Sequence, residues 1–161
     1  MGHYETAKIC LNGHMITSSM ETMHDTDKFC TICGQATITC CTNCNSPIHG
    51  SYYAEGIFNL EDPPVPSYCH NCGHPYPWIE ERLRAAENII NMLDSLTNDQ
   101  RKQLIDFIPD ITMETPRSEY AALIYAKLLD GLQGFVVECF KHWCEKNVLP
   151  SLLVLMNIQK Q

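Results

Sequence analysis

The first 77 residues contain no arginine and only two lysines, Lys8 and Lys28, against seven acidic side chains. Nucleic-acid backbones are bound by clustered Lys and Arg side chains, so this deficit argues against nonspecific binding of nucleic acid. The full chain of 161 residues carries a formal charge of −8, which points the same way. We therefore expect a partner other than nucleic acid.

A long apolar run and an export signal are also lacking. A membrane-spanning helix needs about 18 apolar residues, and the nearest candidate, 149–158, is short and interrupted by Pro150. The first residues have neither the basic nor the apolar region of a secretory signal. We expect a cytoplasmic protein that does not contact membranes, in which the ten cysteines do not form disulfides.

The cysteines are arranged as metal ligands. Three Cys-x-x-Cys turns occur between residues 30 and 72, and each is followed by Gly or Asn, namely Gly34, Asn45 and Gly73. This is the zinc-knuckle pattern, in which two thiolates face one ion, backbone amides donate to sulfur, and the following residue takes a positive φ. A fourth pair, Cys-x-x-x-His, precedes them.

Together the four pairs supply eight ligands, enough for two tetrahedral zinc sites. Pairing them along the chain gives a mixed three-cysteine, one-histidine site followed by an all-cysteine site. A crossed pairing, as in RING domains, is the alternative, but short loop closure favours the sequential one. Zinc is the expected metal and iron the runner-up. Because protein fills all four positions, both ions are expected to be structural. The predicted ligands are Cys10, His14, Cys30, Cys33, Cys41, Cys44, Cys69 and Cys72.

Several other Cys and His residues lie near these pairs. Cys40 lacks the two-residue spacing to Cys44 and is expected to be a spare thiol. His70 and His74 flank the last turn, where they either donate to sulfur or are solvated. His49 is expected to be solvated, and the alternative is that it lines a groove with Tyr52.

Residues 52–68 form an aromatic and proline-rich segment, predicted to be the loop of the second zinc ribbon. It contains Tyr52, Tyr53 and acidic residues but no Lys or Arg, which disfavours binding of single-stranded nucleic acid. A surface that packs within the protein or docks another protein is the better interpretation.

From residue 78 the apolar residues follow helical spacing and glycine becomes rare. Helices are predicted over about 78–95 and over about 97–108, the latter with a Thr97–Gln100 capping box and closed by Pro109. Thr115 and Pro116 predict the next start. The later apolar stripes predict one kinked helix or two, and a short helix from residue 151.

The C-terminal cysteines have a simpler interpretation than a third site. Cys139 and His142 share a helical face while Cys144 is predicted to turn away, so three ligands do not converge. Cys139 is expected to pack in the core. A Cys/His nucleophilic pair is also rejected, because no third orienting group is visible. The predicted fold is small α+β, with a tandem zinc-ribbon module of short hairpins over 1–77 and a bundle of three to five helices over 78–161.

Four stretches carry a resemblance to a known family. They are Cys10-Leu-Asn-Gly-His14, Lys28-Phe-Cys-Thr-Ile-Cys-Gly34, Thr42-Asn-Cys-Asn-Ser-Pro-Ile48 and Tyr68-Cys-His-Asn-Cys-Gly-His-Pro-Tyr-Pro-Trp78. They resemble the bacterial family catalogued as domain of unknown function 2321, a run of zinc-ribbon motifs followed by a helical region. The resemblance is close over 4–80, and beyond it only the helix content matches. It implies the same eight ligands and a bacterial, cytosolic protein, without implying an activity. Asn45 in place of the usual Gly, and the extra Cys40, depart from the pattern.

The functional expectation is a zinc-binding adaptor that binds another protein and that also forms a homo-oligomer through its helical half. A nucleic-acid-associated regulator built on the ribbons is the alternative, disfavoured by the charge balance. An enzyme of unknown reaction is the second alternative. No base, nucleophile and open metal position are combined in this sequence, so we expect no catalysis.

Overall fold

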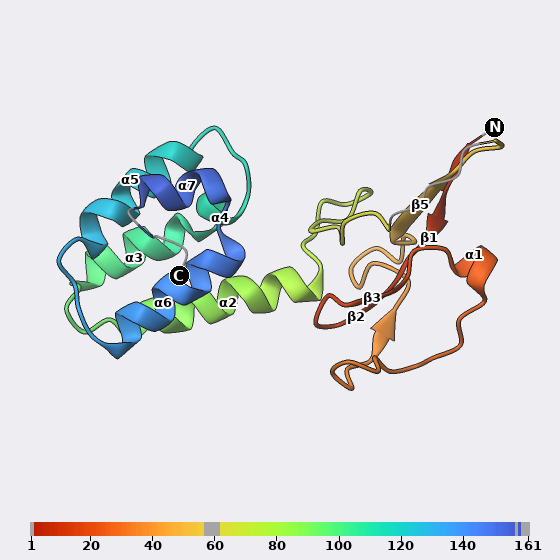
Figure 1. Ribbon diagram of the computed structural model, residues 1–161, viewed down its shortest axis with the longest axis horizontal. Coiled ribbons are helices and arrows are strands. Elements are labelled where there is room, and N and C mark those ends of the chain that lie inside the picture. The colour runs from red at the N-terminus through yellow and green to blue at the C-terminus, as the bar shows by residue number, and fades with distance from the viewer. Residues whose placement is uncertain (1, 57–61, 157, 159–161) are drawn as a thin grey trace. The chain divides into compact units, whose positions relative to one another are not determined.

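The computed structural model (Figure 1) describes residues 2–56, 62–156 and 158. The chain divides into two units, Met1–Glu81 and Arg82–Gln161. Short antiparallel sheets occur in the first unit and helices make up the second, so the small α+β class predicted from the sequence is confirmed. The division lies inside helix α2, four residues after the boundary predicted from the change in composition.

The first unit is built from short strands. β1 pairs antiparallel with β5, placing Tyr4 opposite Tyr52, and β2 lies between β3 and β4 in a second sheet. Tyr52 and Tyr53 thus belong to a strand and not to a loop, while residues 57–61, in the middle of that predicted loop, lie outside the described residues. The elements are β1 (His3–Thr6), β2 (Lys8–Cys10), β3 (Met15–Thr17), α1 (Met20–Met23), β4 (Thr37–Ile38) and β5 (His49–Tyr53).

The three Cys-x-x-Cys turns have the same backbone. In each, the amide of the first cysteine donates to the carbonyl five residues later, at 2.8–2.9 Å, as from Cys30 to Gln35. The residue after the second cysteine donates back to the first at 2.8–3.0 Å. That residue has φ of +74° at Gly34, +58° at Asn45 and +69° at Gly73, as predicted. Asn tolerates this left-handed region better than other residues with a Cβ, which explains its use in the second turn.

The first unit buries few large apolar side chains. Among its described residues the buried ones include Ile9, Ile48, Tyr76 and Trp78, beside the first cysteine of each pair. Trp78 stacks on Tyr76 at 4.8 Å and donates to the Pro66 carbonyl at 2.9 Å. These contacts anchor the start of α2 in the first unit, which is why the unit extends past residue 77.

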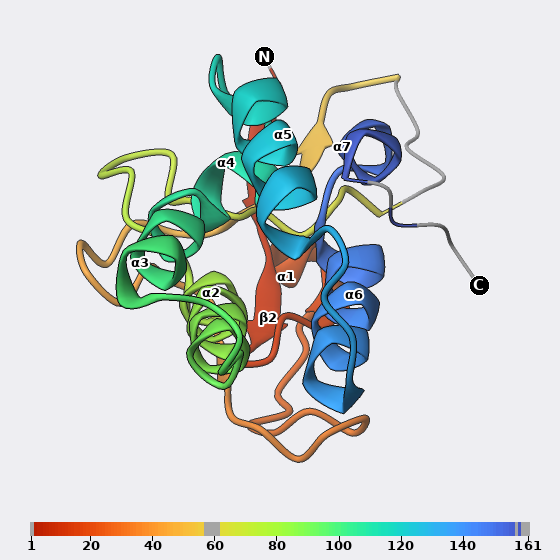
Figure 2. The same ribbon diagram turned by 90° about the vertical axis from the view of Figure 1, so that its left-hand side faces the viewer.

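Among the described residues, the second unit contains five whole helices and most of α2, so six helices replace the three to five predicted. Figure 2 shows α5 and α7 side by side in this unit. α5 and α6 are separate helices, interrupted at Gly131 and Gly134, which decides between the two predicted possibilities. The helices are α2 (Pro77–Asn91), α3 (Asn98–Asp106), α4 (Ile108–Thr112), α5 (Ser118–Leu129), α6 (Phe135–Asn147) and α7 (Pro150–Leu155).

The helix end that was predicted from a capping box agrees with the structure, whereas the ends predicted from prolines do not. Thr97 and Gln100 form the predicted capping box of α3. Pro109 does not simply end that helix, because it occupies the first turn of α4, where a missing N–H costs nothing. The start predicted at Thr115 is also wrong. Thr115 accepts from the Arg117 amide in a turn, and α5 begins at Ser118.

The core of the second unit corrects the predicted face of α6. Val137, Phe140 and Cys144 are buried, whereas Phe135 is 84% exposed and Cys139 is only half-buried. Cys144 therefore packs in the core, the role predicted for Cys139. Cys139 lies beside the buried face and not on it, because the run of apolar residues at 135–137 fits two helical faces equally well.

Within the residues that the structure describes, every helix is too short or too polar to span a bilayer.

Candidate metal centres

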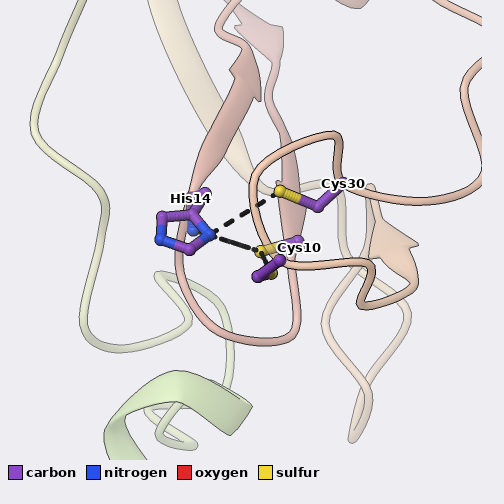
Figure 3. Close-up of side chains that lie close together, drawn as sticks. Cys10, His14 and Cys30 are labelled. Atoms are coloured by element: carbon purple, nitrogen blue, oxygen red, sulfur yellow. Dashed lines mark hydrogen bonds between the residues drawn. The ribbon is translucent and has the colours of Figure 1, made fainter.

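The first group of ligands is assembled by β2, β3 and the first knuckle. Figure 3 shows the His14 ring directed at two sulfurs, with Nδ1 3.4 Å from Cys10 Sγ and 3.6 Å from Cys30 Sγ. Cys33 Sγ completes the group, 3.7 Å from Cys10 Sγ. The hairpin between β2 and β3 brings His14 back over Cys10, since the Cys10 amide donates to the His14 carbonyl at 3.0 Å.

The second group joins the second and third knuckles. Cys41 Sγ lies 3.8 Å from Cys72 Sγ, and Cys44 Sγ lies 3.6 Å from Cys69 Sγ. In both groups all four ligand atoms lie within 4.8 Å of one another. The structure therefore brings the eight predicted residues together in the sequential pairing and not in the crossed one.

The separations can be compared with those of a tetrahedral ion. Metal–sulfur bonds of about 2.3 Å and metal–nitrogen bonds of about 2.0–2.1 Å place two sulfurs about 3.8 Å apart, and sulfur and nitrogen about 3.6 Å apart. The observed values of 3.4–3.8 Å match both. Each group can hold one metal ion with all four positions filled by protein.

Hydrogen bonds prepare thiolates in both groups. Burial raises the pKa of Cys30, but hydrogen bonds from the amides of Ile32 and Cys33, together with those to the Cys33 and His14 side chains, outweigh it and lower the pKa to about 7. The hydroxyl and amide of Ser46, together with Asn71, lower the pKa of Cys44 to about 5. At neutral pH each group thus contains at least one thiol that ionises readily, and the thiolate is the form that binds metal.

Two asparagines that sequence analysis did not single out support the second group. Asn43 Nδ2 donates to Cys72 Sγ at 3.6 Å, and Asn71 Nδ2 donates to Cys44 Sγ at 3.6 Å. Each asparagine thus donates to the opposite knuckle. Both occupy the same position in Cys-x-Asn-Cys, and this repeat was visible in the sequence. The first group has Ile32, which has no side-chain donor, at that position. This agrees with its charge, because three thiolates carry less negative charge than the four of the second group.

Removing these donors is expected to weaken metal binding selectively. The combined change Asn43→Ala and Asn71→Ala should lower the metal affinity of the second group about tenfold or more, because four thiolates lose two partners that disperse their charge. Competition with a chromogenic chelator measures this. Ile32→Ala alters the equivalent position of the first group, and it should leave both affinities unchanged. A double variant that holds metal as tightly as the unaltered protein would contradict this role.

The remaining candidates lie outside both groups. Cys40 is exposed, and its sulfur lies 3.7 Å from the Thr39 hydroxyl. His74 Nε2 lies 3.3 Å from Glu80 Oε1. His142 Nδ1 lies 3.4 Å from Glu145 Oε2 and gathers no cysteine ligand, since no third cluster of metal-binding side chains occurs among the residues described.

His49 and His70 belong to a column of rings. The two imidazoles stack with centroids 3.6 Å apart, and Tyr4 stacks on the other face of His49 at 4.3 Å. Tyr52 meets Tyr4 edge-on at 5.1 Å. Burial and the neighbouring His70 lower the pKa of His49, which disfavours its charged form. Tyr4, Tyr52 and Tyr53 are each about half exposed, so this column borders an aromatic surface.

Comparison with known proteins identifies a family. The model of a family described as "Uncharacterized protein conserved in bacteria (DUF2321)" matches residues 3–145. The match runs through most of α6, so it includes the helical unit beyond the stretch 4–80 where the motifs are recognisable. Neither a curated protein nor a solved structure matched the chain.

Proposed function

The chain belongs to the bacterial family DUF2321, and we propose that it is a zinc-binding adaptor. In this proposal two structural zinc ions hold the first unit as a rigid platform, and the aromatic surface bordered by Tyr4, Tyr52 and Tyr53 binds another protein. The observation that carries the proposal is the pair of closed four-ligand groups.

Zinc is favoured by the donor sets. A tetrahedral group of three cysteines and one histidine, or of four cysteines, is characteristic of structural zinc, and each group resembles the ligand arrangement of a zinc ribbon. Iron is the competing metal for four thiolates, and elemental analysis of the purified protein separates the two. Two equivalents of zinc per chain is the expected result.

A protein partner is favoured by the charge of the platform. Of the two lysines in residues 1–77, Lys8 is buried and pairs with Asp25 at 2.7 Å, so only Lys28 is left to meet a phosphate. Exposed tyrosines on a unit with two lysines and no arginine suit a protein surface, where aromatic side chains contribute most to binding. The same lack of cations disfavours the nucleic-acid alternative.

The docking surface can be tested by a pull-down from a bacterial lysate. Tyr52→Ala combined with Tyr53→Ala should abolish capture of partners that the unaltered protein retains, because the variant loses most of the exposed aromatic area. Tyr120→Ala, which removes a tyrosine 56% exposed in the second unit, should retain them. If the two variants capture the same proteins as the unaltered chain, the proposed surface has no role in binding.

A further inference from the structure

The first unit contains a cavity that the metal centres do not use. It has a volume of about 570 Å³ and is lined by residues of β1, β3, α1 and β5, elements that lie together in Figure 1. Sites for small molecules generally measure about 300–1,000 Å³. The close approach of two segments shapes it, since a Cβ on Gly50 would lie 1.9 Å from the Ser18 carbonyl oxygen.

Three hydroxyl groups in the lining direct their protons to other protein groups. Thr22 donates to Glu5 at 2.6 Å. Ser51 donates to Ser18 at 2.9 Å, and Ser18 donates to Asp62 at 2.5 Å. These three hydroxyls therefore offer a bound molecule their lone pairs, so this part of the lining consists of hydrogen-bond acceptors.

The charge of the lining is negative and incompletely balanced. Among the described residues that line the cavity are Glu5, Asp25 and Asp62, and none of these lining residues is basic. Lys8, just behind it, pairs with Asp25 at 2.7 Å. Glu5 is only 8% exposed, and its one hydrogen-bond partner among the described residues is the neutral Thr22. A buried carboxylate is normally paired with a cation, and among the described residues no cation pairs with Glu5, so its charge points to a cationic ligand.

A bare metal ion does not fit this arrangement. Within the described part of the chain, the only sets of three or more side chains close enough to share an ion are the two cysteine groups. The carboxylates of the cavity are thus too widely spaced to converge on one ion, and the volume is many times that of an ion. An organic cation can reach several of them at once.

We propose that this cavity binds a small organic compound with primary ammonium groups. The N–H groups donate to Glu5 and to the hydroxyl lone pairs, and the positive charge supplies the counterion that Glu5 lacks. Tyr52 and Tyr53, which also line the cavity, suit a cation because their ring faces attract positive charge.

Calorimetric titration of the full-length, zinc-loaded protein tests the proposal with 1,4-diaminobutane as the probe. Binding is expected, while 1,4-butanediol, of similar length but uncharged, should bind at least tenfold more weakly. Tetramethylammonium, which has the charge but no N–H donor, should also bind at least tenfold more weakly. Equal binding of the diol, or no heat from the diamine at millimolar concentration, overturns the proposal, as does tight binding of Ca²⁺ in its place.

Matched variants assign the binding to the cavity. Glu5→Gln keeps the acceptor for Thr22 and removes the charge, and should weaken diamine binding at least tenfold. Glu55→Gln removes the same charge from an exposed residue outside the lining and should leave affinity unchanged. Should Glu5→Gln misfold, Met23→Lys places an ammonium group at the cavity from a residue 68% exposed and is expected to abolish binding. Equal losses in Glu5→Gln and Glu55→Gln, or full affinity in Met23→Lys, rule the cavity out.

Discussion

Replacement of Cys72 or Cys33 by serine is expected to leave residues 1–77 without stable tertiary structure. Each substitution removes one of four ligands, from the second and first groups respectively. Structural zinc contributes about 10–16 kcal/mol of apparent binding free energy, whereas a whole domain is stable by about 5–15 kcal/mol. The buried apolar side chains of the first unit are too few to compensate.

This expectation follows from what the first unit buries. Cys10, Cys30, Cys41 and Cys69 are 0–3% exposed, so the ligands themselves occupy the interior. The strands around them have two to five residues, and two- and three-stranded sheets of this size have marginal stability alone. Without metal, each group becomes a cluster of thiols at van der Waals distance with little apolar surface to hold it.

Nuclear magnetic resonance and elemental analysis measure the outcome on the full chain. The amide signals of residues 1–77 should collapse into the range of an unfolded chain, and the zinc content should fall below two. Cys40→Ser is the matched control, because Cys40 adjoins Cys41 but lies outside both groups. It should keep the dispersed spectrum and two zinc ions. Dispersed signals from Cys72→Ser, or a metal-free yet folded unaltered protein, would contradict a metal-dependent fold.

Replacement of Phe140 by alanine is expected to have the largest effect in the second unit, a loss of about 3–5 kcal/mol. Phe140 is fully buried and stacks with Tyr125 at 5.7 Å and with Trp143 at 5.9 Å between ring centroids. Truncation removes its contacts with both rings and leaves a cavity between α5 and α6. A loss of this size is a large part of the stability of an ordinary domain.

Guanidinium unfolding followed by circular dichroism at helical wavelengths measures the effect. Phe135→Ala, in the same helix, is the control. Phe135 is 84% exposed, so its truncation should change stability by no more than about 0.5 kcal/mol. The zinc content should stay at two in both variants, because all eight ligands belong to residues 10–72. Similar losses from the two phenylalanines would mean that the described core is wrong.

Local features were predictable because neighbouring residues determine them. The ligand pairs, the positive φ at Gly34 and Asn45, and the capping box at Thr97 each depend on fewer than six consecutive residues. Covalent reach fixes the distance between two ligands in a turn, and a cap needs only its own first turn of helix. These signals also located the metal groups and the start of α3.

Features that depend on distant segments were not predictable. Which face of α6 is buried, and hence that Cys144 and not Cys139 packs in the core, depends on the helices packed against it. The same holds for Pro109, which begins α4 where the sequence indicated an end. Asn43 and Asn71 donate across two knuckles 28 residues apart, so only the folded chain shows their role.

By itself, then, the sequence determined the eight residues that gather in the two groups and how they pair, because each pair is a short turn whose geometry is set within it. The tertiary structure decided which side chains from distant segments come into contact around those turns. It stacks the rings of Tyr4, His49 and His70 and buries Glu5 beside a cavity. It also pairs Lys8 with Asp25. Such contacts join β1, β5 and α1 across many residues of chain, and their energies depend on burial and distance, which no local pattern of side chains encodes.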